Sequence, residues 1–152
     1  MIIDNKLSEY KNNIESLKAI DSLEVYRWLV SLGEKLNNDP LSEEKRIDKN
    51  KVSRCQFDLF VDWEGGKFKA WSNATIASGY AYILLDIFNS LPPHLATKIT
   101  VEDFQQVKLD KLLTMNRKTG FYQMIEMIIE KIEDDRWLAE YAESFREKNA
   151  KN

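Results

Sequence analysis

The 152-residue sequence contains one cysteine, Cys55, and one histidine, His94. A single cysteine excludes a disulfide within the chain, and it also excludes a structural zinc site built on several thiolates. No stretch is apolar for the roughly 20 residues that a membrane-spanning helix needs. Residues 1–22 lack the apolar centre of a signal peptide. We therefore expect a protein without a metal, in a reducing, cytoplasmic compartment and not in a membrane.

Several sequence signatures of ligand binding are also missing. There is no glycine-rich phosphate-binding loop and no dinucleotide-binding fingerprint. The net charge of -3, without a dense basic run, argues against a nucleic-acid partner. The acidic run at residues 133–135 is expected to be a solvated helix end, and His94 is expected on the surface. We predict that the chain binds no cofactor.

Hydrophobic residues make up 43% of the chain, enough for one domain of this length to bury a core. Helical spacing of apolar residues predicts a short helix around residues 7–17 and a second one with Ser22 as its N-cap. Gly33 is expected at the end of the second helix, because glycine readily adopts positive φ. Residues 37–54 are charged and poor in apolar side chains, so we expect a long exposed loop with at most one helical turn, near residues 42–45.

After this segment the apolar period changes from 3.6 to two residues. One face of the predicted strand then carries four apolar side chains: Phe57, Leu59, Val61 and Trp63. Gly65-Gly66 predicts a tight hairpin turn, and Phe68 and Ala70 alternate with lysines on the return strand. The pattern therefore predicts a half-buried antiparallel hairpin.

The rest of the chain is predicted to be helical. A broad apolar stripe from Ala74 onward indicates a central, heavily buried helix that ends near Pro92-Pro93. Residues 103–113 are predicted as a weak helix and residues 121–132 as a clean amphipathic one. The fold class is therefore α+β, a small antiparallel sheet built on a hairpin and packed against several α-helices.

A C-terminal helical extension is expected at about residues 134–148, after a break at Asp134-Asp135. Its apolar side chains follow at four-residue steps: Trp137, Tyr141 and Phe145. We expect one domain over residues 1–152, with its core at about residues 23–132.

Cys55 is the residue with the clearest chemical potential. It lies where the polar segment runs into the first strand, and Lys51 and Arg54 are close in sequence. Nearby positive charge favours the thiolate, which is the nucleophilic form of cysteine. However, cysteine is also among the most buried residue types and often packs as a small hydrophobic side chain. The pattern alone leaves both interpretations open.

Four short segments carry a resemblance to a known family. The sequence reads Leu-Gly-Glu-Lys-Leu at residues 32–36, Val-Ser-Arg-Cys-Gln at 52–56, Ser-Asn-Ala-Thr-Ile-Ala-Ser-Gly at 72–79 and Asn-Arg-Lys-Thr-Gly-Phe at 116–121. In this order they resemble the SufE motifs Leu-Gly-x-x-Leu, Val-x-Gly-Cys-Gln, Ser-Asp-Ala-x-Ile-Val-x-Gly and Ser-Arg-x-x-Gly-Leu. The resemblance covers about residues 23–132 and implies a SufE-like fold.

The resemblance also implies a function for Cys55. In SufE proteins this cysteine accepts persulfide sulfur from a PLP-dependent, SufS-like cysteine desulfurase, stimulates that enzyme and passes the sulfur to iron–sulfur cluster assembly. An iron–sulfur scaffold complex is a further expected partner. By this interpretation the chain is a sulfur-transfer partner and not itself an enzyme, and the PLP belongs to the desulfurase.

The resemblance further implies contacts around the cysteine. Arg117 matches the family's arginine, and we expect it to favour the thiolate or to contact the partner, although an ordinary salt bridge is equally compatible with the sequence. Gln56 matches the family's glutamine and is expected to orient the loop. Arg54 and Asp58 are candidates for partner contact, and residues 37–51 are a candidate docking surface.

The sequence also departs from the family pattern near the cysteine. Arg54 replaces a glycine, Phe57 and Asp58 replace serine and glutamine, and Leu112 replaces a histidine. If the glycine has positive φ, Arg54 is strained there or the loop changes shape. These departures keep open a binding module that retains the fold and regulates a desulfurase or another partner without transferring sulfur. An independent cysteine-dependent enzyme is a second alternative, which requires His94 as the base beside the thiol.

Overall fold

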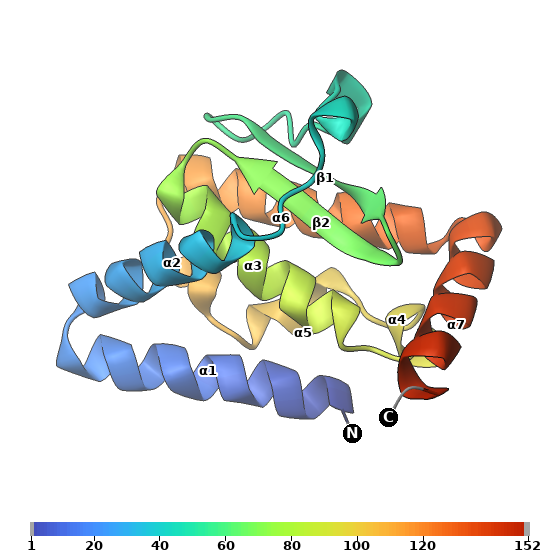
Figure 1. Cartoon of the computed structure of the whole chain (residues 1–152). Helices are drawn as coiled ribbons and strands as arrows, with labels where there is room; N and C mark the ends of the chain where they lie inside the picture. The colour runs from blue at the N-terminus through green and yellow to red at the C-terminus, as the bar shows by residue number, and fades with distance from the viewer. Residues whose placement is uncertain (1, 151–152) are drawn as a thin grey trace.

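The computed structural model describes residues 2–150, apart from the side chains at 2–4, 93, 116, 135–137 and 149–150. Figure 1 shows helices around one antiparallel hairpin, which confirms the predicted α+β class. The hairpin consists of β1 (Leu59–Glu64) and β2 (Lys67–Ser72). The helices are α1 (Ile2–Ile20), α2 (Ser22–Leu36), α3 (Thr75–Asn89), α4 (Pro93–Ala96), α5 (Val101–Gln105), α6 (Met115–Ile132) and α7 (Asp135–Ala150).

The first two helices confirm the predicted helical periodicity, but two details of the prediction were wrong. The N-cap of α2 is Asp21, whose carboxylate accepts a hydrogen bond from the Leu23 N–H at 3.0 Å, and Ser22 is already helical. Gly33 does not end α2, which continues to Leu36. A Cβ at Gly33 would lie 2.9 Å from the Cβ of Ser78, so this glycine allows α2 to approach α3 closely.

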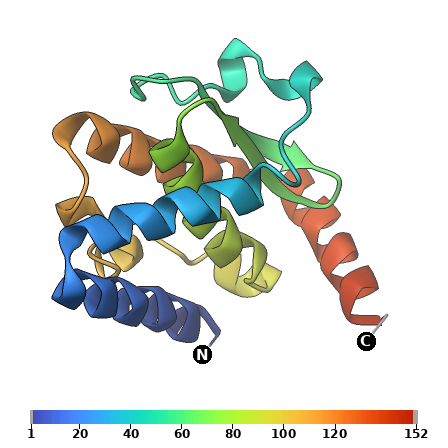
Figure 2. The same cartoon turned by 60° about the vertical axis from the view of Figure 1, so that its left-hand side comes forward.

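The helix α3 is the central element of the fold, as its broad apolar stripe predicted. It packs against α1, α2, α6 and β2, and Tyr80, Leu84 and Phe88 along it are fully buried. Figures 1 and 2 show α3 beneath the hairpin, with α2 crossing α3. This helix therefore fixes the positions of the elements around it.

The hairpin has the predicted turn and the predicted buried face. Its strands pair in register from Leu59 opposite Ser72 to Glu64 opposite Lys67. Gly65 and Gly66 have φ angles of 63° and 86°, a left-handed pair that suits a two-residue hairpin turn. Phe57 was wrongly predicted in the strand. It lies before β1 with 44% of its surface exposed.

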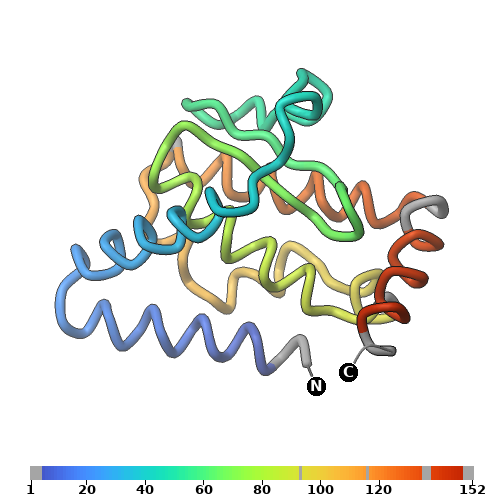
Figure 3. The backbone as a smooth tube through the Cα atoms, in the orientation of Figure 1, coloured from blue at the N-terminus to red at the C-terminus, as the bar shows by residue number. Residues whose placement is uncertain are grey.

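The segment between α2 and β1 is only partly the exposed loop that was predicted. Leu41 and Val52 are fully buried, and the Leu41 N–H donates to the Ala70 carbonyl at 3.1 Å. Two 3₁₀ turns, Glu43–Lys45 and Asp48–Asn50, break the segment, the first where a helical turn was expected. Figure 3 shows this path folding back along the edge of the hairpin. The prediction was wrong in part because the segment has many charged residues and only a few apolar residues that become buried.

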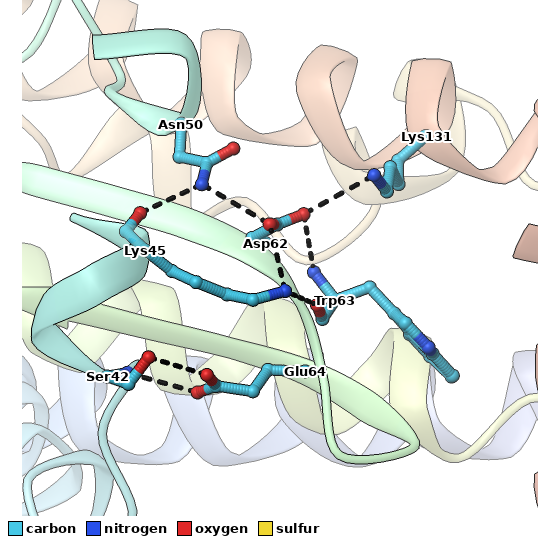
Figure 4. Close-up of polar contacts among 7 residues, drawn as sticks. All are labelled: Ser42, Lys45, Asn50, Asp62, Trp63, Glu64 and Lys131. Carbon is cyan, nitrogen blue, oxygen red and sulfur yellow. Dashed lines mark hydrogen bonds and ion pairs between the residues drawn. The ribbon is translucent and has the colours of Figure 1, made fainter. Parts of the chain in front are cut away.

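Asp62 on β1 fastens this segment to the rest of the fold (Figure 4). Only 10% of its side chain is exposed. Its carboxylate accepts from Lys45 Nζ at 3.4 Å and from Asn50 Nδ2 at 3.2 Å, and Lys131 Nζ of α6 lies 3.5 Å from it. One largely buried carboxylate thus joins the segment, the hairpin and α6.

Asp62→Ala is expected to lower the free energy of unfolding by about 2 kcal/mol, because Lys45, Asn50 and Lys131 each lose a contact with this largely buried carboxylate. Lys45 and Asn50 each keep one hydrogen bond, to the backbone carbonyls of Trp63 and Lys45 respectively, which limits the loss. Urea unfolding measures this loss.

The matched control is Asp39→Ala, which removes two ion pairs, to Lys67 and Lys69, from a side chain that is 52% exposed. The control is expected to cost no more than about 1 kcal/mol. Equal losses in the two variants would contradict the anchoring role of Asp62.

One prediction for the C-terminal part of the chain was wrong. The weak helix predicted at residues 103–113 is divided into α5 and a 3₁₀ turn, Leu109–Lys111. Lys108 has a φ of 63°, a left-handed conformation that a continuous helix cannot contain. The C-terminal helix α7 forms as predicted, and the Tyr141 hydroxyl donates to the Leu91 carbonyl. The Trp137 side chain lies outside the described residues, and the domain division stays a prediction.

Candidate functional site around Cys55

Cys55 lies in a closed turn just before β1. We call residues 51–58 the Cys loop. Lys51 pairs with Phe60 in an isolated antiparallel bridge, and the Val52 N–H donates to the Leu59 carbonyl at 2.8 Å. The Cys55 N–H donates to the Val52 carbonyl at 3.0 Å. These backbone bonds make the Cys loop an extension of the hairpin edge, with Cys55 near its tip.

Side chains from two other elements hold the Cys loop. On α6, the Gln123 side chain accepts from the Arg54 N–H at 2.6 Å and donates to the Ser53 hydroxyl at 2.9 Å. At the junction of β2 and α3, the Asn73 side chain accepts from the Asp58 N–H at 3.1 Å. The Cys loop is therefore fastened at both of its flanks, and Figures 1 and 2 both show it next to the start of α3.

The Cys55 side chain is half-buried and lines a cavity of about 450 Å³. The walls come from the Cys loop, the start of α3 and the start of α6: Gln56, Phe57, Asn73, Ala74, Thr75, Ile76, Ala77, Tyr80 and Arg117. The sequence left open a reactive cysteine and a buried core cysteine. The structure combines features of both, because the side chain packs against the core and also lines a cavity.

Tyr80 of α3 is the nearest polar neighbour of the sulfur. Its side chain is fully buried, and its hydroxyl lies 3.7 Å from Cys55 Sγ. Burial, and then the neighbouring Cys55, raise the pKa of Tyr80 above its ordinary value, and Arg117 opposes this shift. Tyr80 therefore remains a protonated phenol over the pH range in which a cysteine thiol ordinarily titrates.

Arg117 lies in the first turn of α6 and lines the same cavity. Among the residues that the structure describes, it has no ion-pair or hydrogen-bond partner. The ordinary salt bridge that the sequence left open is thus not formed with these residues. An unpaired guanidinium beside a thiol can attract the thiolate or another anion.

The other predicted residues take different positions around the thiol. Gln56 is exposed and lines the cavity. Arg54 and Asp58 are exposed on the outside of the Cys loop, where Asp58 Oδ1 lies 3.6 Å from Lys51 Nζ. Arg54 is not left-handed, since Lys108 is the one non-glycine residue with positive φ in the described backbone. The Cys loop therefore accepts arginine in place of the family's glycine without this strain.

His94 and Leu112 stand apart from the site. His94 is exposed on α4 and does not line the cavity, and α4 lies far from the Cys loop in Figures 1 and 2. Leu112 accepts a hydrogen bond from the Tyr26 hydroxyl through its backbone carbonyl. The described residues include no cluster of three or more side chains suited to a metal ion. No described helix combines the length and apolarity needed to cross a membrane.

Sequence reasoning missed three residues of the site: Tyr80, Gly120 and Gln123. A Cβ at Gly120 would lie 2.9 Å from the Tyr80 hydroxyl and 3.3 Å from the Cα of Cys55. Tyr80 was assigned only to the apolar stripe of α3, and Gln123 had no pattern at all. The one available signal was the glycine at position 120 in the segment that resembles a SufE motif.

Comparison with known proteins identifies the family of the chain. The SufE family model, described as an Fe-S metabolism associated domain, matches residues 11–132, which is most of the chain. A protein of Synechocystis sp. that is named as an uncharacterised SufE-like protein is 31% identical over 107 residues. That match covers 68% of this chain and 66% of the relative, just under two thirds of its length. The chain therefore belongs to the SufE family, whose domain is associated with Fe–S metabolism.

Proposed function

We propose that Cys55 is a sulfur acceptor and carrier. It takes sulfur from the persulfide of a PLP-dependent, SufS-like cysteine desulfurase, stimulates that enzyme and passes the sulfur to iron–sulfur cluster assembly. The observation that carries the proposal is the cavity in which the single cysteine lies together with Arg117, for which the described residues supply no ion-pair or hydrogen-bond partner. We place this reaction in the cytoplasm, because a free thiol persists in a reducing compartment.

The transfer is a thiol exchange that needs no oxidant. The Cys55 thiolate attacks the terminal sulfur of the donor persulfide, and a new S–S bond forms on Cys55. The S–S bond of the donor breaks, and its electron pair leaves with the donor cysteine as a thiolate. The transferred sulfur remains a persulfide, so no net oxidation or reduction takes place. Release of the desulfurase thiolate allows its next turnover, which accounts for the stimulation.

The residues around Cys55 have separate proposed roles. Arg117 favours the thiolate before transfer and the persulfide anion after it, because a nearby cation lowers the energy of either anion. Gln56 lines the opening next to the thiol and orients the Cys loop. Arg54 and Asp58 point outward and are proposed to contact the desulfurase. The scaffold that receives the sulfur is a further proposed partner.

Two other functions fit the structure less well. An independent cysteine-dependent hydrolase needs a base beside the thiol, and His94 is not in the cavity. A binding module without transfer gains support from Phe57, which is 44% exposed beside Cys55 and could serve as an apolar contact for a partner. The module would stimulate or inhibit the desulfurase through binding alone, without use of the thiol.

The experiment that separates transfer from binding uses wild-type protein before and after alkylation of Cys55 with iodoacetamide. A cysteine desulfurase is assayed for alanine formation from free cysteine at rising concentrations of each form. Sulfur transfer predicts that the free thiol form increases turnover several-fold and that the alkylated form gives no increase. If both forms stimulate the desulfurase equally, binding alone is sufficient and the carrier proposal is wrong.

A further inference from the structure

The Tyr80 hydroxyl is a buried polar group with one described partner. The only hydrogen-bond contact of this hydroxyl in the described structure is Cys55 Sγ, at 3.7 Å. A buried hydroxyl without a partner is costly, so this contact matters to the tyrosine as well as to the sulfur. The ring is held in place by Phe121 of α6, edge to face, with centroids 5.7 Å apart. The hydroxyl is therefore fixed at the sulfur.

The backbone of α6 closes the other side of this pair. Gly120 is buried, and a Cβ on it would lie 2.9 Å from the Tyr80 hydroxyl and 3.3 Å from both Cα and Cβ of Cys55. The absence of a side chain at position 120 leaves room for the hydroxyl and the cysteine to meet. The three residues come from α3, α6 and the Cys loop, so the tertiary fold creates this contact.

The direction of the hydrogen bond follows from the charge on the sulfur. With a neutral thiol, either group can donate, but a thiolate or persulfide anion can only accept. Because burial keeps the Tyr80 phenol protonated, Tyr80 can act as the donor. A hydrogen bond from a neutral donor to an anion is stronger than one between two neutral groups.

The other described polar and charged groups near Cys55 form no hydrogen bond with the sulfur. From α6, Arg117 is the one cation among the described residues that lines the cavity. Within the Cys loop, Arg54 is exposed and Lys51 is paired with Asp58. At the junction of β2 and α3 the cavity is lined by Asn73, which is neutral. Among the described residues, Tyr80 is therefore the hydroxyl that contacts the sulfur, and Arg117 is the cation that lines the same cavity.

We infer that Tyr80 is a catalytic residue of sulfur acceptance, which donates a hydrogen bond to Cys55 Sγ and stabilises its anionic form. The inference deepens the proposed function and rests on it for the step in which sulfur is transferred. The inference gives α3 a part in the chemistry, whereas the apolar pattern of this helix indicates only packing in the core. The hydrogen bond itself can be tested without any partner protein.

The test compares wild type with Tyr80→Phe, which removes the hydroxyl and keeps the ring. The rate of Cys55 alkylation by iodoacetamide is followed from pH 6 to pH 10. Loss of a hydrogen bond to the anion is expected to move the midpoint of this profile upward by about one pH unit. At pH 7 the rate is expected to fall about threefold, because the more basic thiolate is intrinsically more nucleophilic and offsets part of the loss.

Tyr10→Phe is the matched control. Tyr10 is also a buried tyrosine, but its hydroxyl donates to Asp86 Oδ2 at 2.5 Å, outside the Cys55 cavity. The control is expected to keep the wild-type alkylation profile. A second variant, 3-fluorotyrosine at position 80, covers the case in which Tyr80→Phe does not fold. Its more acidic phenol is a stronger donor, so the midpoint is expected to move downward.

An unchanged midpoint in folded Tyr80→Phe, or in the fluorotyrosine variant, would overturn the role of Tyr80. Sulfur acceptance from a desulfurase is measured in parallel to separate the two proposals. Acceptance by wild type together with an unchanged midpoint overturns the role of Tyr80 and leaves the carrier function intact. A shifted midpoint in a protein that accepts no sulfur supports the hydrogen bond but overturns the carrier function and, with it, the catalytic assignment of Tyr80.

Discussion

Cys55→Ser is expected to abolish sulfur acceptance completely while the protein stays folded and still binds the desulfurase. Serine keeps the shape of the side chain, but its hydroxyl is not ionised near neutral pH and cannot attack a persulfide. The backbone bonds that hold the Cys loop do not involve the sulfur. The measurement is desulfurase turnover with the variant alone, and then with increasing variant added to a fixed amount of wild type.

The control is the competition between the variant and wild type for the desulfurase. A folded variant that binds but cannot accept sulfur is expected to displace wild type and to lower the stimulated rate toward the basal one. Urea unfolding checks that the variant and wild type have the same midpoint. Stimulation by Cys55→Ser at the wild-type level would identify the protein as a binding module.

Gly79→Ala is expected to be the most destabilising methyl addition in the fold, with a loss of about 3 kcal/mol or more. A Cβ at Gly79 would lie 2.2 Å from the Leu29 carbonyl oxygen and 2.7 Å from its carbonyl carbon. Both atoms belong to the backbone of α2, so no side chain can rotate away. The two helices must separate, and the packing around the centre of the core would be lost. The free energy of unfolding in urea measures the effect.

The control is Gly65→Ala in the hairpin turn. A Cβ there meets nothing within 4 Å, but the backbone has a φ of 63°. This variant is expected to lose only about 1–2 kcal/mol from the left-handed conformation, with no steric contribution. A loss in Gly65→Ala that equals or exceeds the loss in Gly79→Ala would contradict the close contact between α2 and α3.

The elements predicted from the sequence are those with strong local signals. The pair Gly65-Gly66 and the alternation around Leu59 predicted the hairpin, and the stripe from Ala74 predicted α3. The errors arise where contacts distant in sequence decide the structure. Gly33 suggests a helix end by its residue type, yet its role is to contact α3. Residues 37–54 were predicted as exposed because this segment contains more charged residues than apolar residues that become buried.

The candidate site was predicted to a similar extent. The sequence identified Cys55 and Arg117, and the structure brings both to one cavity. Tyr80 could not be found in this way, because a tyrosine within an apolar stripe reads as a core residue. Its contact with the sulfur exists only through packing of α3 against α6 and the Cys loop. A chemical role that depends on such packing can be recognised only from the tertiary structure.

The central claim is most directly tested by the mass of the intact protein. Wild type is incubated with a cysteine desulfurase and free cysteine, and the protein is analysed by mass spectrometry without reductant. We predict a gain of about 32 Da, one sulfur atom, that maps to the peptide containing Cys55 and disappears after reduction. A folded protein with a free thiol that gains no sulfur from several desulfurases would contradict the claim that Cys55 is a sulfur acceptor.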